Sequence, residues 1–282
     1  MRSGAPSLMA RGAAAYRAIH QTLDGAAIFA DPFAARVLDD ATRASLDALA
    51  ADPSRRQMRL FVVVRSRFSE DALATSVARG VRQIVVLGAG LDTFSLRNPF
   101  AAAGVRVFEV DHPATQAWKR ERLKEAGLSE PASLTFAPVD FEQQSLADGL
   151  AKVGFRADRP AFFQWLGVTP YLTREAISGT LDFIAAIPGS AVVFDYAEPL
   201  ENHAPARRAR LTAAAEQAAA RGEPWLSFFE PAELASILRD KGFAVIEDVG
   251  LAELIRRYAP ALGADSEAGP SGHVLRAERS DS

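Results

Sequence analysis

The sequence predicts an α/β fold in which a seven-stranded, doubly wound sheet follows an N-terminal helical extension. Three observations support this prediction. Residues 83–96, QIVVLGAGLDTFSL, run from a short aliphatic segment into a glycine turn. Acidic residues end the next two apolar segments, and strand patterns alternate with helix patterns along the rest of the chain. Such alternation is typical of a parallel sheet with helices on both faces.

The glycine turn indicates a nucleoside site at the end of the first strand. Gly88, Ala89 and Gly90 directly follow the aliphatic residues 84–87. Glycine lets the backbone approach a ligand that a Cβ atom would obstruct. The carboxyl end of the first strand is also where doubly wound sheets bind nucleotides. The G-x-G pattern alone is a weak indication, because a share of such turns bind no nucleoside.

The spacing within the turn favours S-adenosylmethionine over NAD. A dinucleotide fingerprint requires a third glycine at position 93, where this chain has Thr93. Asp92 lies close to the place of a pyrophosphate, and a carboxylate there repels phosphates but attracts a sulfonium and an α-amino group.

Composition limits the kind of protein. The chain has 282 residues, 49% of them hydrophobic, which is enough for one large α/β domain with an extension. No apolar run approaches the ~20 residues that cross a bilayer, and no secretory signal is evident, so we expect a cytoplasmic protein. The chain lacks cysteine and its four histidines are scattered, so we expect no metal site. A net charge of −3 without a basic block argues against nucleic-acid binding.

The first 80 residues carry a mainly helical pattern. We expect helices over 10–23 and 55–76, and another that begins at Asp31 as N-cap with a proline after it. Packing alone would explain this layer, but a helical layer ahead of the first strand commonly covers a cofactor. Arg65 in the third helix is open to two interpretations, a surface salt bridge or a clamp on a cofactor carboxylate.

The second strand, predicted over 105–110, leads to Asp111. This residue lies 21 positions beyond Gly90, the offset of a ribose-binding carboxylate in such sheets. Glu109 points to the same side, but only the residue at the strand tip reaches the crevice. The alternative is that Asp111 caps a helix predicted over 113–126, and one residue can do both.

The third strand, predicted over 134–139, also ends in an acid. Asp140 could accept a hydrogen bond from an adenine amine, and Phe141 could stack on the ring. Acids at two strand tips and glycines after the first strand surround a single crevice, which predicts a nucleoside site.

The fourth strand, predicted over 161–165, is strongly aromatic. The loop after it faces the reacting group in this architecture, so Tyr171 is a candidate substrate contact. The alternative for Tyr171 is a core aromatic whose hydroxyl is satisfied.

The remaining strands are predicted over 191–196, 243–249 and 272–277, with a helix over 230–242. A long Ala/Arg-rich helix pattern over 199–222 interrupts them. It is either a solvated helix or a mobile lid over the substrate. We therefore divide the chain into a helical cover, residues 1–80, and a cofactor-binding domain, residues 81–282, that contains this insertion.

Several segments of the chain form a recognisable set: VLGAGLDTFSLR, FEVDHPATQAWKR, PVDFE, GVTPYLT and GEPWLSFFEPAEL, with AYRAIHQTLDG and FADPFA near the N-terminus. Together they resemble the S-adenosylmethionine-dependent methyltransferases of the leucine carboxyl methyltransferase superfamily, in particular its bacterial branch with the polyketide O-methyltransferases. The similarity covers nearly the whole chain. It implies a class I methyltransferase (Rossmann-like) fold with its last strand antiparallel, and S-adenosyl-L-methionine as cofactor with S-adenosyl-L-homocysteine as product.

The resemblance also implies roles for individual residues. Arg65 matches an arginine that binds the cofactor carboxylate, Gly88 the glycine of the cofactor loop, and Asp111 the ribose-binding acid. Asp140 and Phe141 match the adenine-binding pair. The predicted cofactor site further includes the adjoining Ala89, Gly90, Asp92, His112 and Gln164. One departure concerns the methionine portion of the cofactor, because many members contact it with a glutamate where this chain has Leu166.

Methyl transfer to oxygen on a small molecule follows from the resemblance, with a carboxylate or a hydroxyl as acceptor. A carboxylate needs no general base, whereas a hydroxyl would benefit from one. The candidate bases are His20, Tyr171, Asp195 and His203, and the first two are also candidate substrate contacts. None of them is assigned as catalytic.

Two other functions stay open at this point. An NAD(P)-dependent oxidoreductase could use the same kind of sheet, although Thr93 and Asp92 argue against it. A catalytically silent S-adenosylmethionine-binding protein is the other alternative, because Leu166 replaces a cofactor contact. The sequence leaves the identity of the acceptor and the oligomeric state open.

Overall fold

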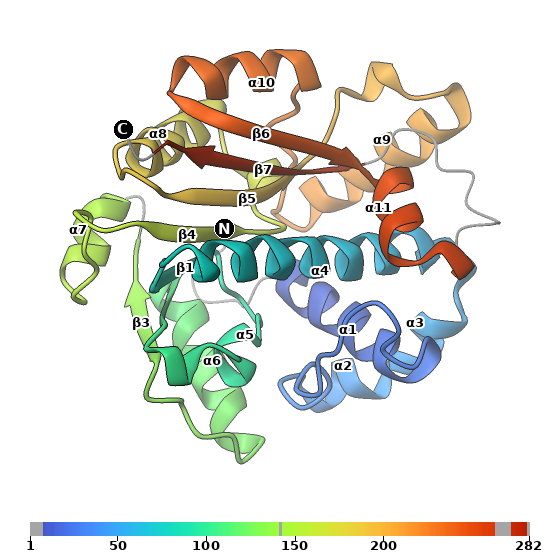
Figure 1. Ribbon diagram of the computed structural model, residues 1–282. Coiled ribbons are helices and arrows are strands. Elements are labelled where there is room, and N and C mark those ends of the chain that lie inside the picture. Colours follow the sequence, from blue (N-terminus) through green and yellow to red (C-terminus); the bar gives the residue numbers. More distant parts are fainter. Residues whose placement is uncertain (1–7, 141–142, 263–271, 281–282) are drawn as a thin grey trace.

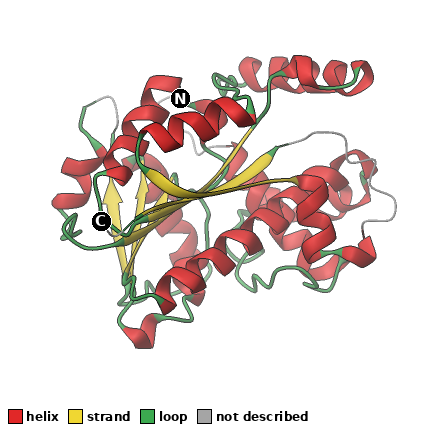
Figure 2. Ribbon diagram, turned by 45° about the horizontal axis from the view of Figure 1, so that its top comes forward, coloured by secondary structure: helices red, strands yellow, loops and turns green. Residues whose placement is uncertain are grey.

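The computed structural model describes residues 8–140, 143–262 and 272–280. Its centre is a seven-stranded sheet in the order β3-β2-β1-β4-β5-β7-β6, with helices on both faces (Figures 1 and 2). The strands are β1 Gln83–Leu87, β2 Arg106–Asp111, β3 Leu134–Pro138, β4 Ala161–Trp165, β5 Ala191–Tyr196, β6 Phe243–Gly250 and β7 His273–Arg279. Neighbouring strands are parallel except that β7 is antiparallel to both β5 and β6. This confirms the predicted doubly wound sheet and its antiparallel last strand.

Burial of both sheet faces explains why the central strands are continuous apolar runs. Every residue of β1, β4 and β5 is buried. Alternate residues enter different cores, since Ile84 and Val86 pack on one face and Val85 and Leu87 on the other. A strand buried on both faces therefore has no polar alternation in its sequence.

The α-helices cover the sheet and extend beyond it. They are α1 Leu8–Leu23, α2 Asp40–Ala44, α3 Leu46–Ala51, α4 Arg56–Ala78, α5 Phe94–Arg97, α6 Pro113–Glu125, α7 Leu146–Ala151, α8 Arg174–Ala185, α9 Pro205–Ala220, α10 Pro231–Asp240 and α11 Leu251–Tyr258. Short 3-10 turns are η1 Pro53–Arg55, η2 Ala101–Ala103, η3 Thr169–Tyr171, η4 Leu200–Asn202 and η5 Pro260–Leu262. Apolar residues of α4 and α11 fill one face of the sheet, and those of α7, α8 and α10 fill the other.

The N-terminal helix α1 packs beside the glycine turn rather than on the sheet. A third core cluster joins Ala14, Ala15 and Ala18 of α1 to Leu91 in the turn and Leu123 in α6. The alanine-rich sequence of α1 thus has a physical reason, because small side chains allow close approach. Figure 1 shows α1 and the short α2 and α3 grouped at one side of the molecule, next to the end of α4.

The prediction of a helix from Asp31 is wrong. Residues 32–38 form a series of turns, with single bonds such as Ala34 N to Asp31 O (3.2 Å) in place of a helical ladder. The Asp31 side chain does accept from Phe33 N (3.2 Å), as a capping residue would. It is also bonded to groups in α1 and the glycine turn, so tertiary contacts, not a helix, determine its role.

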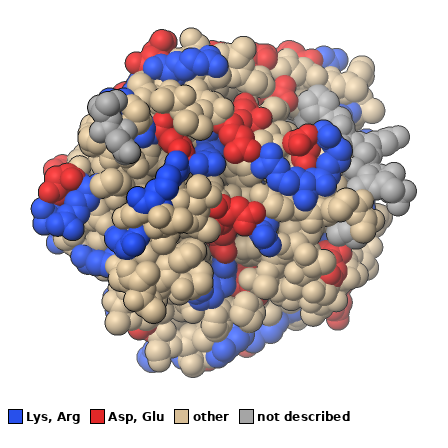
Figure 3. Space-filling view, viewed as in Figure 1, with Lys and Arg blue, Asp and Glu red and all other residues tan. Residues whose placement is uncertain are grey.

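The predicted insertion over 199–222 contains η4 and α9. None of the residues of α9 is buried, which fits the solvated-helix interpretation, and its possible role as a lid stays a prediction. Within the described part of the chain, no helix is both long and apolar enough to cross a bilayer. Basic and acidic side chains lie interspersed over the face seen in Figure 3, without a broad area of one sign.

Candidate cofactor and active site

The topology brings most of the predicted site residues to one edge of the sheet. The parallel strands β3, β2, β1, β4 and β5 are adjacent in that order, so their carboxyl ends meet at the same edge. Along it lie Asp140 after β3, Asp111 at the end of β2, the glycine turn after β1, Gly167 after β4 and Asp195 near the end of β5. This is the crevice in which doubly wound sheets bind ligands.

The glycine turn is tightly enclosed on two sides. Gly88 has φ +63°, and a Cβ there would lie 2.5 Å from Cγ2 of Val168 in the loop after β4. Gly90 has φ +45°, and its Cβ would lie 2.8 Å from Cβ of Ala10 in α1. Ala89 between them is buried and donates to Val110 O at 3.1 Å. Both glycines are therefore required by backbone conformation and by space.

Asp111 is bonded to the glycine turn. Its Oδ2 accepts from Gly90 N at 2.6 Å and its Oδ1 from His112 N at 2.7 Å. Burial raises the pKa of Asp111, and the two backbone donors offset part of that rise. The N-cap of α6 is His112, whose Nδ1 accepts from Ala114 N at 3.2 Å. The alternative in which Asp111 caps this helix is therefore wrong.

Glu109 takes no part in the crevice, as expected from its position before the strand tip. It is fully buried and lies 2.5 Å from Lys119 Nζ and 2.7 Å from Ser95 Oγ. Burial raises the pKa of Glu109, and Lys119 opposes the rise. The pair holds α6 and α5 against β2.

Asp92 and Gln164 belong to one hydrogen-bonded chain. Asp92 Oδ1 accepts from Phe94 N at 2.8 Å, and its Oδ2 accepts from Gln164 Nε2 at 3.2 Å. Gln164 Oε1 in turn accepts from Ser69 Oγ of α4 at 3.2 Å. The glycine turn, β4 and α4 are thereby held in register around the crevice.

Asp140 lies in a turn after β3. Its Oδ2 accepts from Gln143 Nε2 at 2.6 Å, and its carbonyl accepts from the backbone N–H groups of Gln143 and Gln144. Phe141 is outside the described residues, so its stacking on adenine stays a prediction.

Arg65 forms a buried ion pair, and the surface salt bridge considered for it is wrong. Its Nη1 donates to Asp195 Oδ2 at 2.7 Å, and the two residues are 8% and 4% exposed. Asp195 Oδ1 accepts from Gly167 N at 2.5 Å. Gly167 has φ +75°, and a Cβ there would lie 2.8 Å from Nη2 of Arg65. This cluster lies directly beside the glycine turn, because Val168 follows Gly167.

Tyr171 lies in η3 near this ion pair. Burial raises the pKa of Tyr171 to about 12, a hydrogen bond from the Trp225 side chain opposes the rise, and the charges of Glu223, Arg65 and Asp195 also act on it. The side chain is half-buried rather than part of the core. Its phenol is therefore protonated at neutral pH.

His20 holds the N-terminal layer together. It is fully buried, and its Nε2 accepts from Ile28 N (3.2 Å) and Phe29 N (3.3 Å). Nδ1 then carries the proton and donates to Asp24 at 2.8 Å. Both ring nitrogens are used within this layer, so His20 has a structural role in this arrangement. His203 is likewise buried, in the loop before α9.

Asp31 links the N-terminal layer to the glycine turn, a role that was not predicted from the sequence. Asp31 is 0% exposed and accepts from Arg17 Nε at 2.8 Å and from Thr93 Oγ1 at 2.7 Å. Arg17 also donates to Leu91 O at 2.7 Å. Burial raises the pKa of Asp31, but Arg17, Arg97 and Thr93 outweigh it and hold the pKa below its usual range. Asp31-Pro32 is equally typical of a helix start, so the sequence carried no signal for this role.

A second group that was not predicted from the sequence surrounds His273 at the start of β7. Its Nδ1 lies 2.8 Å from Asp248 Oδ1 and its Nε2 lies 2.9 Å from Glu198 Oε1. Burial lowers the pKa of His273, but the two carboxylates outweigh it and raise the pKa above its usual value. Tyr196 donates to the other oxygen of Asp248 at 2.5 Å.

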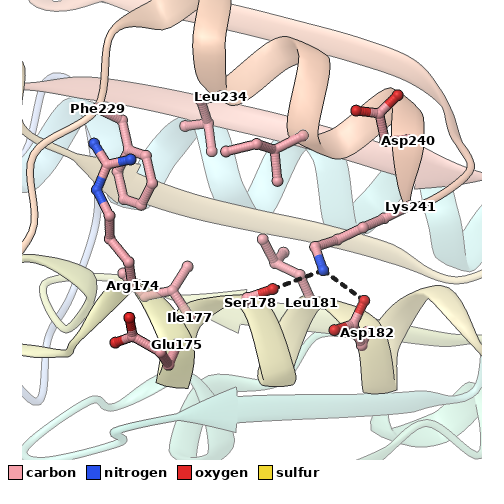
Figure 4. A pocket seen from close by; sticks show the side chains of 11 residues that line it. Arg174, Glu175, Ile177, Ser178, Leu181, Asp182, Phe229, Leu234, Asp240 and Lys241 are labelled. Carbon is pink, nitrogen blue, oxygen red and sulfur yellow. Dashed lines mark hydrogen bonds and ion pairs between the residues drawn. The ribbon is translucent and has the colours of Figure 1, made fainter.

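An open groove of about 610 Å³ lies between α8 and α10 (Figure 4). Ile177, Leu181 and Leu234 form part of its apolar floor. Lys241 on its rim donates to Ser178 Oγ at 2.8 Å and to Asp182 Oδ1 at 2.5 Å. Among the described residues of the predicted cofactor site, none lines this groove, so the groove is separate from the crevice.

Comparison with known proteins agrees with this geometry. The family model described as leucine carboxyl methyltransferase matches residues 10–185. A putative S-adenosyl-L-methionine-dependent methyltransferase, YktD of Bacillus subtilis, is 39% identical over 187 residues, which cover 66% of this chain and 61% of that relative. A protein of the same description from Mycobacterium avium is 29% identical, with 96% of this chain and 94% of the relative covered.

Solved structures show the same fold at low sequence identity. A DUF574 family protein from Streptomyces avermitilis superposes with a TM-score of 0.61 at 17% identity, covering 95% of this chain and 97% of its own. A putative methyltransferase from Thermobifida fusca superposes with a TM-score of 0.59 at 18% identity, covering 99% and 97%. The fold is therefore the class I, Rossmann-like methyltransferase fold. With the family model covering more than half of its length, the chain belongs to the leucine carboxyl methyltransferase family of S-adenosylmethionine-dependent methyltransferases.

Proposed function

We propose that this protein transfers the methyl group of S-adenosylmethionine to a carboxylate oxygen of a small molecule. The crevice suits the cofactor chemically. Asp111 and Asp140 offer acceptors for ribose hydroxyls and an adenine amine, and the two glycines allow close backbone approach. Arg65 Nε is buried without a hydrogen-bond partner in the described structure, which is the kind of donor that a bound carboxylate would satisfy.

The observation that supports a carboxylate acceptor is the state of the candidate bases. Both ring nitrogens of His20 are engaged, and both oxygens of Asp195 accept hydrogen bonds. Tyr171, with a pKa of about 12, keeps its proton near neutral pH. Neither His20 nor Tyr171 is therefore suited to take a proton from a hydroxyl, and Asp195 is held in its ion pair with Arg65. An acceptor that is already an anion needs no base.

When bound, S-adenosylmethionine supplies an activated methyl group on a sulfonium. The O–CH₃ bond forms as the S–CH₃ bond breaks with its electron pair staying on sulfur, so a carboxylate becomes a methyl ester and no proton is released. The protein then has to align the acceptor and exclude water. We propose that the protonated Tyr171 donates to the acceptor carboxylate beside the half-buried Trp225, and that residues 8–80 close the crevice over the cofactor.

A thermal-shift titration with S-adenosylmethionine, S-adenosylhomocysteine and NAD tests the cofactor. A ligand at about 100 times its dissociation constant stabilises by about 2.7 kcal/mol, which raises the melting temperature by several degrees. We expect a shift with the two sulfur nucleosides and none with NAD. A shift with NAD alone would contradict the proposal and support the oxidoreductase alternative.

A labelled methyl group tests the acceptor class. Small carboxylic acids and phenols are incubated with the protein and methyl-labelled cofactor, and the products are treated with mild alkali. An ester releases labelled methanol, whereas an ether keeps its label. Transfer only into alkali-stable product would refute the carboxylate acceptor.

The Tyr171→Phe variant should raise KM for the acceptor while leaving the affinity for S-adenosylhomocysteine unchanged.

A further inference from the structure

The buried pair of Arg65 and Asp195 lacks an explanation in packing alone. Two charges removed from water cost several kcal/mol each, and a pair buried in this way is weak support for stability. Arg65 Nη1 and Asp195 Oδ2 are 2.7 Å apart at 8% and 4% exposure. The pair nevertheless leaves Arg65 Nε buried and unsatisfied within the described structure. An unsatisfied Nε also occurs in Arg11, Arg122, Arg207 and Arg276, but that of Arg65 belongs to an ion pair beside Gly167 at the carboxyl edge of the sheet, where an anionic ligand could satisfy it.

The position of the pair along the sheet edge indicates which part of the cofactor it meets. The nucleoside acids Asp140 and Asp111 belong to β3 and β2, and the glycine turn follows β1. The Arg65–Asp195 pair contacts Gly167, which follows β4 on the other side of β1. A cofactor whose adenosine lies over β2 and β3 therefore directs its amino acid end toward this pair.

That amino acid end is a zwitterion, and the pair matches it in charge. A carboxylate requires a cationic donor and an ammonium requires an anionic acceptor. Leu166 supplies neither, since its apolar side chain packs against the core beside α4. Asp195 offers a carboxylate held in place by two donors, Gly167 N and Arg65. Each of its oxygens retains a lone pair beyond the one in use.

With Arg65 facing the cofactor carboxylate, as the family resemblance implies, we propose that Asp195 accepts from the ammonium group of S-adenosylmethionine, so that the two residues together hold its amino acid end. Asp195 thereby takes over the contact that Leu166 does not provide, and it acts as a cofactor-binding residue rather than a base. The inference rests on the proposed cofactor. Its test distinguishes a wrong role for Asp195 from a wrong cofactor.

Calorimetric titration of the full chain with three probes tests this role of Asp195. S-adenosylhomocysteine carries both charges, its deaminated analogue lacks the ammonium, and 5′-methylthioadenosine lacks the whole amino acid end. For the wild type we expect S-adenosylhomocysteine to bind about tenfold or more tightly than the deaminated analogue, because a hydrogen bond to a charged group is lost. In Asp195→Asn that difference should collapse, with the affinity for 5′-methylthioadenosine unchanged.

The control variant is Glu278→Gln. Glu278 is also a largely buried, ion-paired carboxylate, bonded to Arg79 at 2.6 Å, but it lies opposite Ala191 at the other edge of the sheet. It should keep the full discrimination between the probes. The double variant Leu166→Glu/Asp195→Asn should regain part of the lost discrimination, because it returns a carboxylate beside Gly167.

Several outcomes would overturn the inference. If Asp195→Asn keeps the wild-type discrimination, the ammonium binds elsewhere. If it loses affinity for all three probes equally, Asp195 is only structural. If that variant does not fold, the wild-type protein still tests the inference. Equal affinity of the wild type for S-adenosylhomocysteine and its deaminated analogue would show that Asp195 does not bind the ammonium group. Failure of the wild type to bind S-adenosylhomocysteine at all would instead contradict the proposed function.

Discussion

Replacing Asp31 by asparagine should loosen the N-terminal layer from the cofactor loop. The carboxylate of Asp31 is the common partner of Arg17 in α1 and Thr93 in the glycine turn. Asparagine keeps the shape of the side chain but removes its charge. Arg17, only 6% exposed, is then left without its anion.

The size of the effect follows from this burial. Removing one partner of a buried ion pair costs about 3–5 kcal/mol. Arg17 retains its bond to Leu91 O at 2.7 Å, so we expect the lower end, about 3 kcal/mol. For a chain of this size that corresponds to a fall in melting temperature of about 6–12 °C. The affinity for S-adenosylhomocysteine should fall as well, because the loop that carries Gly88 and Gly90 loses the charged hydrogen-bond acceptor of Thr93.

Thermal denaturation followed by circular dichroism measures the change, with Asp158→Asn as control. Asp158 is exposed and pairs only with the neighbouring Arg156 among the contacts described, so its variant should melt like the wild type. The pKa of Asp31 is lowered in the folded state. Its stabilising effect is therefore complete above the ordinary pKa of aspartate, about 4, and is lost as pH falls through the lower folded value. The difference in melting temperature between the wild type and Asp31→Asn should therefore become smaller at acidic pH. An Asp31→Asn variant that melts no lower than Asp158→Asn at neutral pH would refute this reasoning.

Three further predictions concern the crevice and the sheet edge. Asp111→Ala should weaken S-adenosylhomocysteine binding by a factor of about 5 to about 150, because two ribose hydrogen bonds of about 0.5–1.5 kcal/mol each are lost. A calorimetric Kd equal to that of the wild type would show that Asp111 does not belong to the cofactor site. Gly88→Ala should destabilise more than Gly127→Ala in thermal denaturation, because both have φ +63° but only Gly88 would place a Cβ against Val168; equal losses would contradict the close approach. The raised pKa of His273 means that its stabilising effect is present below the ordinary histidine pKa of about 6.5 and is lost as pH rises through the folded value. His273→Gln should therefore flatten the fall in melting temperature as the pH rises above about 6.5, and an unaltered profile would count against it.

Most of the sheet could be predicted from the sequence because each strand has a recognisable pattern of neighbouring residues. Continuous apolar runs such as 83–87 and 161–165 identify strands buried on both faces. The glycines of the turn and the acid at position 111 mark the carboxyl edge through spacing alone. Strand boundaries differed by at most two residues, as in β7, which ends at Arg279 where Ala277 was expected, whereas α9 begins at Pro205, six residues after the expected start.

The roles of charged side chains were decided by tertiary structure. Arg65 and Asp195 are 130 positions apart, and nothing local to either indicates that they form one buried pair. Asp31 has the local pattern of a helix cap, yet its carboxylate accepts hydrogen bonds from Arg17 and Thr93, which lie in other elements. His20 resembles a substrate contact on the sequence level but has both nitrogens bonded within its own layer.

The sequence by itself thus determined the class of fold, the family resemblance, and the edge of the sheet at which we predict the ligand site. These depend on periodicity, on glycine conformation and on short spacings, which are properties of neighbouring residues. The tertiary structure alone decided which buried charges are paired, and therefore which are available to a ligand. The physical reason is that the free energy of a charge depends on its burial and on the groups within a few ångströms, and the fold brings those groups together from distant parts of the chain.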